Sequence, residues 1–283
     1  HYLVAERGGR GSSRKIHRMA LLAKGGKPNP AGRRFDQEAR RSGAQSRGQH
    51  RGRGRGGPWV PPRRNEVVAE LAGADLLPAI HFIFSRAGCD EARDTVVRDG
   101  LVLNDAREAA AVDAHIAERL ESVGEADRSA LRVDNWADAL RRGIASHHAG
   151  LVPLFKEVTE ELFIAGLVKL VYATETLALG VNLPARSVVI DRLTKFTGET
   201  HEVLTPGQFT QLTGRAGRRG LDEEGHALVC WSPFVPFDRV AGLAGSRDFV
   251  LRSAFRPTYN MVANMVEGRT RAEAVDLLAR SFA

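Results

Sequence analysis

From Asn65 onward, short apolar runs alternate along the chain with longer segments that have the spacing of amphipathic helices. This alternation restricts the fold, because parallel strands need helical crossovers and buried parallel strands read as continuous apolar runs. Five runs predict strands: Ala79–Phe84, Gly143–His148, Val168–Thr174, Arg186–Asp191 and His226–Trp231. The sequence therefore predicts an α/β domain whose parallel sheet is flanked by helices and holds its ligands at the carboxyl ends of the strands.

The segments between these runs have helical patterns. Ala87–Val97 and Leu151–Gly166 each predict one helix, with Gly166 as the C-cap, and Asp105–Arg142 predicts further helix with charged faces. Arg256–Ala283 is largely helical in pattern after its proline. We expect residues 247–283 to be the start of a further, helical domain.

The positive charge of the chain is concentrated near its beginning. Residues 1–65 hold 17 Lys and Arg against 3 Asp and Glu, whereas residues 66–283 hold 24 against 31. The first 65 residues also contain 12 Gly and 5 Pro, so we predict a mostly disordered basic linker there. Arg47–Gly57 alternates arginine with glycine, which suits either flexible binding to RNA phosphates or a solubilising linker.

The cysteine count limits the class of protein. Cys89 and Cys230 cannot form a disulfide framework or a zinc site, and we predict no metal site in the chain. No signal peptide and no apolar run of about 18 residues is evident, so we expect a cytoplasmic protein without a membrane partner. The chain begins at His1 without a methionine, and we expect it to be a fragment of a longer protein.

The segment QLTGRAGRRG, Gln211–Gly220, combines three arginines with three glycines. A helix that opens at Pro206 or Gly207 would place Gln211, Arg215 and Arg218 on one face. Glycines weaken a helix but let a phosphate or another backbone approach closely. One guanidinium group can bind two phosphate oxygens at once. The alternative is a solvated basic helix end in which Asp222 and Glu223 pair with Arg218 and Arg219.

Three more polar clusters lie at or just after predicted strands: FIFSRAGCDEA (Phe82–Ala92), SHHAGLVP (Ser146–Pro153) and YATETLALGVNLPA (Tyr172–Ala185). We expect all four clusters to meet at one edge of the sheet.

In this order the four clusters resemble motifs of the second RecA-like domain of superfamily 2 helicases, specifically the superkiller-type, exosome-associated DExH-box RNA helicases and their HelY-type relatives. FSRAGCDEA resembles motif IV, HHAGL the segment before motif V, ATETLALGVNLPA motif V and QLTGRAGRRG motif VI. The resemblance covers about Glu66 to Ser246, which implies a RecA-like domain over residues 66–246, and continues more weakly through Pro257–Val266.

The resemblance implies roles for individual residues. Arg218, Arg215 and Gln211 would be catalytic, with Arg218 as the arginine finger and Gln211 at the phosphate or the attacking water. Nucleotide binding is implied for Gly180, Asn182, Gln211, Arg215 and Arg218, and nucleic-acid binding for Ser85, Arg86, His148, Gly150, Thr174 and Thr176. Singly, these could also be ordinary strand-end and capping residues, and His147 and His148 could be satisfied histidines.

The sequence contains no GxxxxGK[ST] segment and no DExH box. GGKPNP, Gly25–Pro30, lacks the spacing, and DEEGH, Asp222–His226, has one residue too many and follows motif VI. The first RecA-like domain, which would hold ATP phosphates and Mg²⁺, is therefore expected outside this chain, and the chain alone should not hydrolyse ATP.

The sequence thus favours part of an ATP-dependent RNA helicase that acts on single-stranded RNA or on a duplex with an overhang, with the first RecA-like domain of the same polypeptide as its partner. A DNA helicase is the first alternative. The second is a non-enzymatic RNA-binding module that depends on the Arg/Gly segment.

Overall fold

The computed structural model describes residues 1–7, 14–48, 59–180, 183–196, 198–246 and 258–279. The chain divides into two compact units, His1–Ser246 and Arg247–Ala283. The first unit contains the sheet and every candidate site residue that the structure describes. The second unit contains the helices α11 (Tyr259–Gly268) and α12 (Arg271–Ala279), in agreement with the predicted helical pattern.

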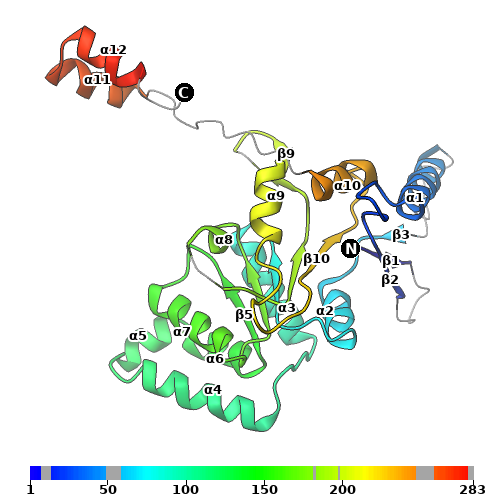
Figure 1. The fold of residues 1–283 in the computed structure, drawn as a ribbon. Helices are drawn as coiled ribbons and strands as arrows, with labels where there is room; N and C mark the ends of the chain where they lie inside the picture. The colour runs from blue at the N-terminus through cyan, green and yellow to red at the C-terminus, as the bar shows by residue number, and fades with distance from the viewer. Residues whose placement is uncertain (8–13, 49–58, 181–182, 197, 247–257, 280–283) are drawn as a thin grey trace. The chain divides into compact units, whose positions relative to one another are not determined.

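One sheet organises the first unit (Figure 1). In order across the sheet its strands are β2 (Ile16–Met19), β1 (Tyr2–Glu6), β10 (His226–Cys230), β7 (Ser187–Ile190), β4 (Ala79–Phe82), β6 (Leu170–Ala173) and β5 (Ile144–His147). The six strands from β1 to β5 in this order are parallel, while β2 and the short β3 (Trp59–Val60) pair antiparallel with β1. All five predicted strands are present, and the predicted α/β class with a RecA-like parallel sheet is confirmed.

Both faces of the sheet are covered by helices, because successive side chains of a buried strand point to opposite faces. Ile80 and Phe82 belong to one apolar cluster, whereas Ala79 belongs to the other. The first cluster includes residues of α4 (Ala106–Arg119), α6 (Val133–Arg141), α7 (Pro153–Ile164), α9 (Pro206–Thr213) and α10 (Phe237–Gly245). The second includes residues of α2 (Arg64–Gly73) and α3 (Arg86–Arg98).

The helical predictions hold in type and differ in detail. The helices expected over Ala87–Val97 and Leu151–Gly166 appear as α3 and α7, and Gly166 adopts a φ of 77° just after α7. The long segment 105–142 divides into α4, α5 (Glu125–Ala130) and α6. A hairpin of β8 (Thr194–Phe196) and β9 (His201–Val203) was not predicted. None of the helices in the described ranges has the length and apolar composition that a membrane span requires.

The prediction that residues 1–65 are mostly disordered is wrong for the part that the structure describes. Tyr2, Leu3, Val4 and Ala5 are each at most 1% exposed, because β1 adds to the sheet beside β10. The folded unit therefore includes His1 onward and is not confined to residues 66–246. The physical reason is that one run of four apolar residues suffices for a buried strand, although the composition averaged over 65 residues is polar and rich in glycine.

The helix α1 (Pro30–Gly48) also joins this unit. Asp36 is 5% exposed and accepts hydrogen bonds from Trp231 Nε1 at 3.2 Å and from the backbone N–H of Phe237 at 3.0 Å. The ring of Phe237 leaves no room for a side chain at Gly32. Most of the Arg47–Gly57 segment lies outside the described residues.

Candidate functional site

The loops that follow β4, β6 and β5 lie side by side at the carboxyl edge of the sheet. The backbone N–H of Ile83 donates to the carbonyl of Ala173 at 2.9 Å, and that of Thr174 donates to the carbonyl of His147 at 3.2 Å. A Cβ atom built on Gly150 would lie 3.4 Å from Cδ of Arg86. The structure thus brings together the predicted nucleic-acid residues Ser85, Arg86, His148, Gly150, Thr174 and Thr176.

Arg86 is the exposed cation of this group, at the first turn of α3. Ser85 caps the same helix, and its hydroxyl accepts from the backbone N–H of Gly88 at 3.1 Å. The hydroxyls of Thr174 and Thr176 lie 2.8 Å apart. Ser85 and the two threonines therefore have local partners, in agreement with the capping alternative, while the arginine points a positive charge toward solvent.

His148 is held in one orientation by two neighbours. Its Nδ1 accepts from the backbone N–H of Gly150 at 3.1 Å, so its Nε2 carries the proton and donates to Asp90 at 3.0 Å. Asp90 also accepts from Ser146 at 2.7 Å. Burial alone would raise the pKa of Asp90, but the hydrogen bonds from His148 and Ser146 outweigh it and hold that pKa below its usual range. His148 thus positions the Gly150 loop, as the satisfied-histidine alternative requires.

Three further residues support this edge and were not among the predicted site residues. Asp90 lies within the quoted motif IV segment, four residues after Arg86, so helical spacing could have identified it. Glu175 forms an ion pair with Lys195 of β8 at 3.0 Å, which no local pattern indicates. His147 donates from Nε2 to Glu160 at 2.6 Å, and burial lowers the pKa of this histidine against the opposing effect of Glu160.

The arginine segment does not share this edge. The backbone N–H of Ala185 donates to the carbonyl of Arg215 at 2.9 Å, and that of Gly217 donates to the carbonyl of Ala185 at 2.7 Å. Because Ala185 precedes β7, motif VI lies at the amino ends of the strands. The prediction that all four clusters meet at one edge is therefore wrong for this one.

The predicted helical face of Gln211, Arg215 and Arg218 is also wrong. The helix α9 opens at Pro206 as predicted but ends at Thr213, so the two arginines lie in the following loop. Gly217 adopts a φ of 92°, a left-handed conformation that turns the chain. A Cβ atom on Gly225 would lie 2.5 Å from the Ala216 carbonyl, so the close approach that the glycines permit is to the chain's own backbone.

The two arginines bind different partners within the chain. The guanidinium of Arg215 donates to the carbonyl of Ala178, in the short helix α8 (Thr176–Gly180) of motif V. Arg218 donates from Nε and Nη2 to the two carboxylate oxygens of Asp222, each at 2.8 Å. This is the ion pair that the solvated-helix alternative predicted, although it closes a turn and not a helix. Gln211 is exposed on α9, and Asn182 lies outside the described residues.

The Arg218 pair predicts a pH-dependent stability. The hydrogen bonds from Arg218 lower the pKa of Asp222 from 3.8 to about 2, so the carboxylate stabilises the fold fully above pH 3.8 and loses this contribution as the pH falls through about 2. Asp222→Asn should therefore lower the melting temperature at neutral pH, and the difference from wild type should shrink as the solution is acidified. Glu223→Gln, at the exposed neighbouring position, should produce no such difference. If the melting temperature of Asp222→Asn stays below that of the wild type by a constant amount across the acid range, the ion pair with Arg218 is not the cause of the difference.

Comparison with known proteins gives one family match. Residues 126–220 match the helicase conserved C-terminal domain. The chain is 53% identical over 233 residues to a probable helicase HelY of Mycobacterium tuberculosis, covering 82% of this chain and 26% of that protein. It is 38% identical over 221 residues to the DExH-box ATP-dependent RNA helicase DExH11 of Arabidopsis thaliana, covering 77% and 16%. It is 37% identical over 220 residues to the human superkiller complex protein 2, covering 76% and 17%. The chain thus spans about a quarter or less of the length of these relatives.

Proposed function

Because this chain belongs to the superkiller-type family of DExH-box helicases and contains their helicase C-terminal domain, we propose that it is the second RecA-like motor domain of an ATP-dependent RNA helicase. In the intact protein, ATP would close this domain and the first RecA-like domain on a single strand. Hydrolysis would reopen them, so that the enzyme moves along or unwinds RNA.

One observation carries this proposal: motif V connects the two edges of the sheet. The helix α8 begins at Thr176, beside the nucleic-acid residues, and two residues later the Ala178 carbonyl accepts from Arg215 of motif VI. A displacement of the arginine loop would therefore act directly on the helix that begins at the threonines. Through such a short, hydrogen-bonded connection, a change in the bound nucleotide would alter the affinity of the carboxyl edge for RNA.

The arginine loop fits a phosphate ligand. The Arg218 guanidinium already holds two coplanar oxygens of Asp222, and a phosphate presents oxygens in a similar arrangement. In the closed enzyme Arg218 and Arg215 would stabilise charge on the γ-phosphate, with Gln211, Gly180 and Asn182 nearby. The Mg²⁺ ligands and the remaining phosphate contacts would come from the first RecA-like domain.

The carboxyl edge would hold the sugar–phosphate backbone of RNA without reading its sequence. Arg86→Ala is expected to weaken RNA binding by this chain about tenfold, because it removes one charge-assisted hydrogen bond to phosphate. The slope of the logarithm of the binding constant against the logarithm of the salt concentration should also become shallower by about one. Fluorescence anisotropy with oligonucleotides of several sequences at several salt concentrations measures both effects. The weakening should be similar for all sequences.

Arg98→Ala is the matched control, because Arg98 is an exposed arginine at the opposite end of the same helix. If both variants bind RNA as the wild type does, the carboxyl edge is not the RNA site. Equal weakening by both variants would indicate a diffuse effect of charge and would also count against the assignment.

The alternatives need separate tests. A deletion of residues 1–65 would remove β1 from the sheet, so it cannot isolate the Arg/Gly segment. Arg51, Arg53 and Arg55 lie outside the described residues, so replacing them by serine changes no residue of a described helix or strand. Loss of all RNA affinity in that variant would favour the non-enzymatic RNA-binding module. A DNA helicase would bind and respond to DNA strands as well as RNA, whereas an RNA enzyme would contact the 2′-hydroxyl.

A further inference from the structure

Three potential metal ligands converge at the carboxyl ends of the neighbouring strands β4, β7 and β10. His81 is in β4, Asp191 directly follows β7 and Cys230 ends β10. One ligand atom from each residue lies within 4.8 Å of the other two. The three residues are far apart in the sequence, which is why no local spacing indicated a metal site.

His81 is the residue that points to a ligand. It is 0% exposed, and neither of its ring nitrogens has a hydrogen-bond partner among the described residues. Its Nε2 lies 3.4 Å from Oδ1 of Asp191, but without the geometry of a hydrogen bond. A buried imidazole is costly to leave without partners, and a metal ion bound at Nε2 would satisfy the nitrogen that faces Asp191.

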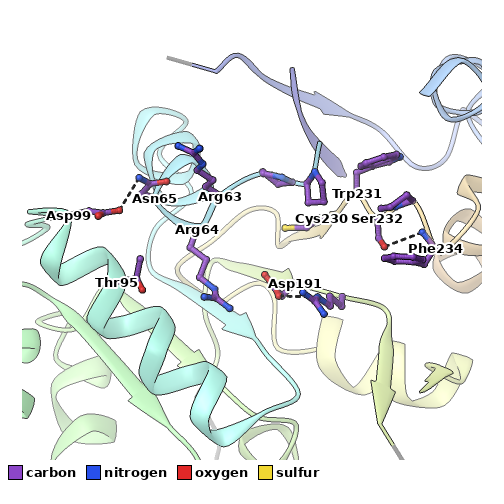
Figure 2. A pocket seen from close by; sticks show the side chains of 14 residues that line it. Arg63, Arg64, Asn65, Thr95, Asp99, Asp191, Cys230, Trp231, Ser232 and Phe234 are labelled. Atoms are coloured by element: carbon purple, nitrogen blue, oxygen red, sulfur yellow. Dashed lines mark hydrogen bonds and ion pairs between the residues drawn. The ribbon is translucent and has the colours of Figure 1, made fainter. Parts of the chain in front are cut away.

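The cluster is open to solvent on one side. Asp191 and Cys230 line a pocket of about 490 Å³ together with residues 61–65 and 231–234. In Figure 2 the sulfur of Cys230 and the carboxylate of Asp191 lie next to each other on the wall of this pocket. The pocket provides an entry path and space for a water molecule as a fourth ligand.

The charges around the cluster are compatible with a divalent cation. The Asp191 carboxylate faces His81 Nε2 at 3.4 Å and supplies an anionic oxygen to the cluster. Arg64 and Arg192 line the same pocket and would oppose an isolated cation. A carboxylate and a thiolate together cancel the charge of one divalent ion, so the bound cluster would add no net positive charge beside the arginines.

We propose that His81, Asp191 and Cys230 bind one zinc ion, with a water molecule from the pocket as the fourth ligand. One sulfur, one nitrogen and one oxygen ligand suit tetrahedral zinc, whereas magnesium and calcium require oxygen ligands. The ion would join three adjacent strands near the loop of Ser85. This site is independent of the proposed motor function, because none of its ligands belongs to the nucleotide or nucleic-acid residues.

The experiment uses the chain without an affinity tag, stripped of metal by a chelator and titrated with zinc chloride. We expect one zinc ion per chain by calorimetry and elemental analysis. At about 100 times the zinc Kd, the melting temperature should rise by about 5–10 °C. Cobalt chloride should give the ligand-field bands of a tetrahedral site and a thiolate charge-transfer band in the near ultraviolet.

The chain offers a matched control, because its only other cysteine, Cys89, is also buried. Cys230→Ser should lose the thiolate band and the thermal shift, and Cys89→Ser should keep both. Asp191→Asn keeps the side-chain shape and should raise the zinc Kd, which provides a test if Cys230→Ser fails to fold. The proposal is overturned if the wild type binds no zinc, or if both Cys230→Ser and Asp191→Asn bind it as tightly as the wild type.

Discussion

In a protein that joins this chain to the first RecA-like domain, Arg218→Ala is expected to lower ATP turnover by about 10³- to 10⁵-fold. ATP binding should stay largely intact, because the guanidinium would act mainly on charge that develops in the transition state. The structure adds a step to this mechanism. Arg218 is held by both oxygens of Asp222, so in the proposed mechanism closure of the two domains would have to transfer the guanidinium from that carboxylate to the phosphate.

Steady-state ATPase kinetics in the presence of RNA, with a separate measurement of ATP binding, test this prediction. Arg219→Ala is the matched control, because Arg219 is the exposed neighbouring arginine in the same turn. Its turnover should remain near that of the wild type. Wild-type turnover in Arg218→Ala would remove Arg218 from catalysis, and a loss of ATP binding in place of turnover would assign it a different role.

The second large effect concerns stability. Leu3→Ala is expected to lower the free energy of unfolding by about 2–5 kcal/mol, because Leu3 is 0% exposed and its truncation would leave a cavity beside β10. A disordered N-terminal segment, as its composition predicts, would show no effect at all. The variant therefore decides directly whether β1 is part of the sheet.

Urea unfolding of the chain measures this difference. Leu221→Ala provides the control, because the Leu221 side chain is 75% exposed and its truncation should change the free energy of unfolding by less than about 0.5 kcal/mol. An unchanged urea midpoint for Leu3→Ala would mean that β1 contributes little to the stability of the sheet.

The central fold could be predicted from sequence because its signals are local. Each of the strands β4, β5, β6, β7 and β10 is a short apolar run that is buried on both faces, and Pro206 marks the first turn of α9. The hairpin of β8 and β9 was missed because each strand has only three residues, all of which are exposed or half-buried.

The candidate site could be predicted only in part. The residues of the carboxyl edge follow predicted strands, so their proximity follows from a parallel sheet. The position of Arg215 and Arg218 could not be derived in this way, because it depends on the backbone pairing of Ala185 with the motif VI loop. The same holds for the proposed metal ligands His81, Asp191 and Cys230. They are neighbours because β4, β7 and β10 are adjacent in the sheet, and this strand order cannot be read from local sequence patterns.

The place of β1 also has a mechanical consequence. Hydrogen bonds join β1 to β10 on one side and to β2 on the other, including those from Val229 to His1 and from Trp231 to Leu3. A pull on chain joined ahead of His1 would act along this strand and load its bonds in shear, all at once. Tension applied at this end would therefore pass directly into the sheet that holds both candidate sites.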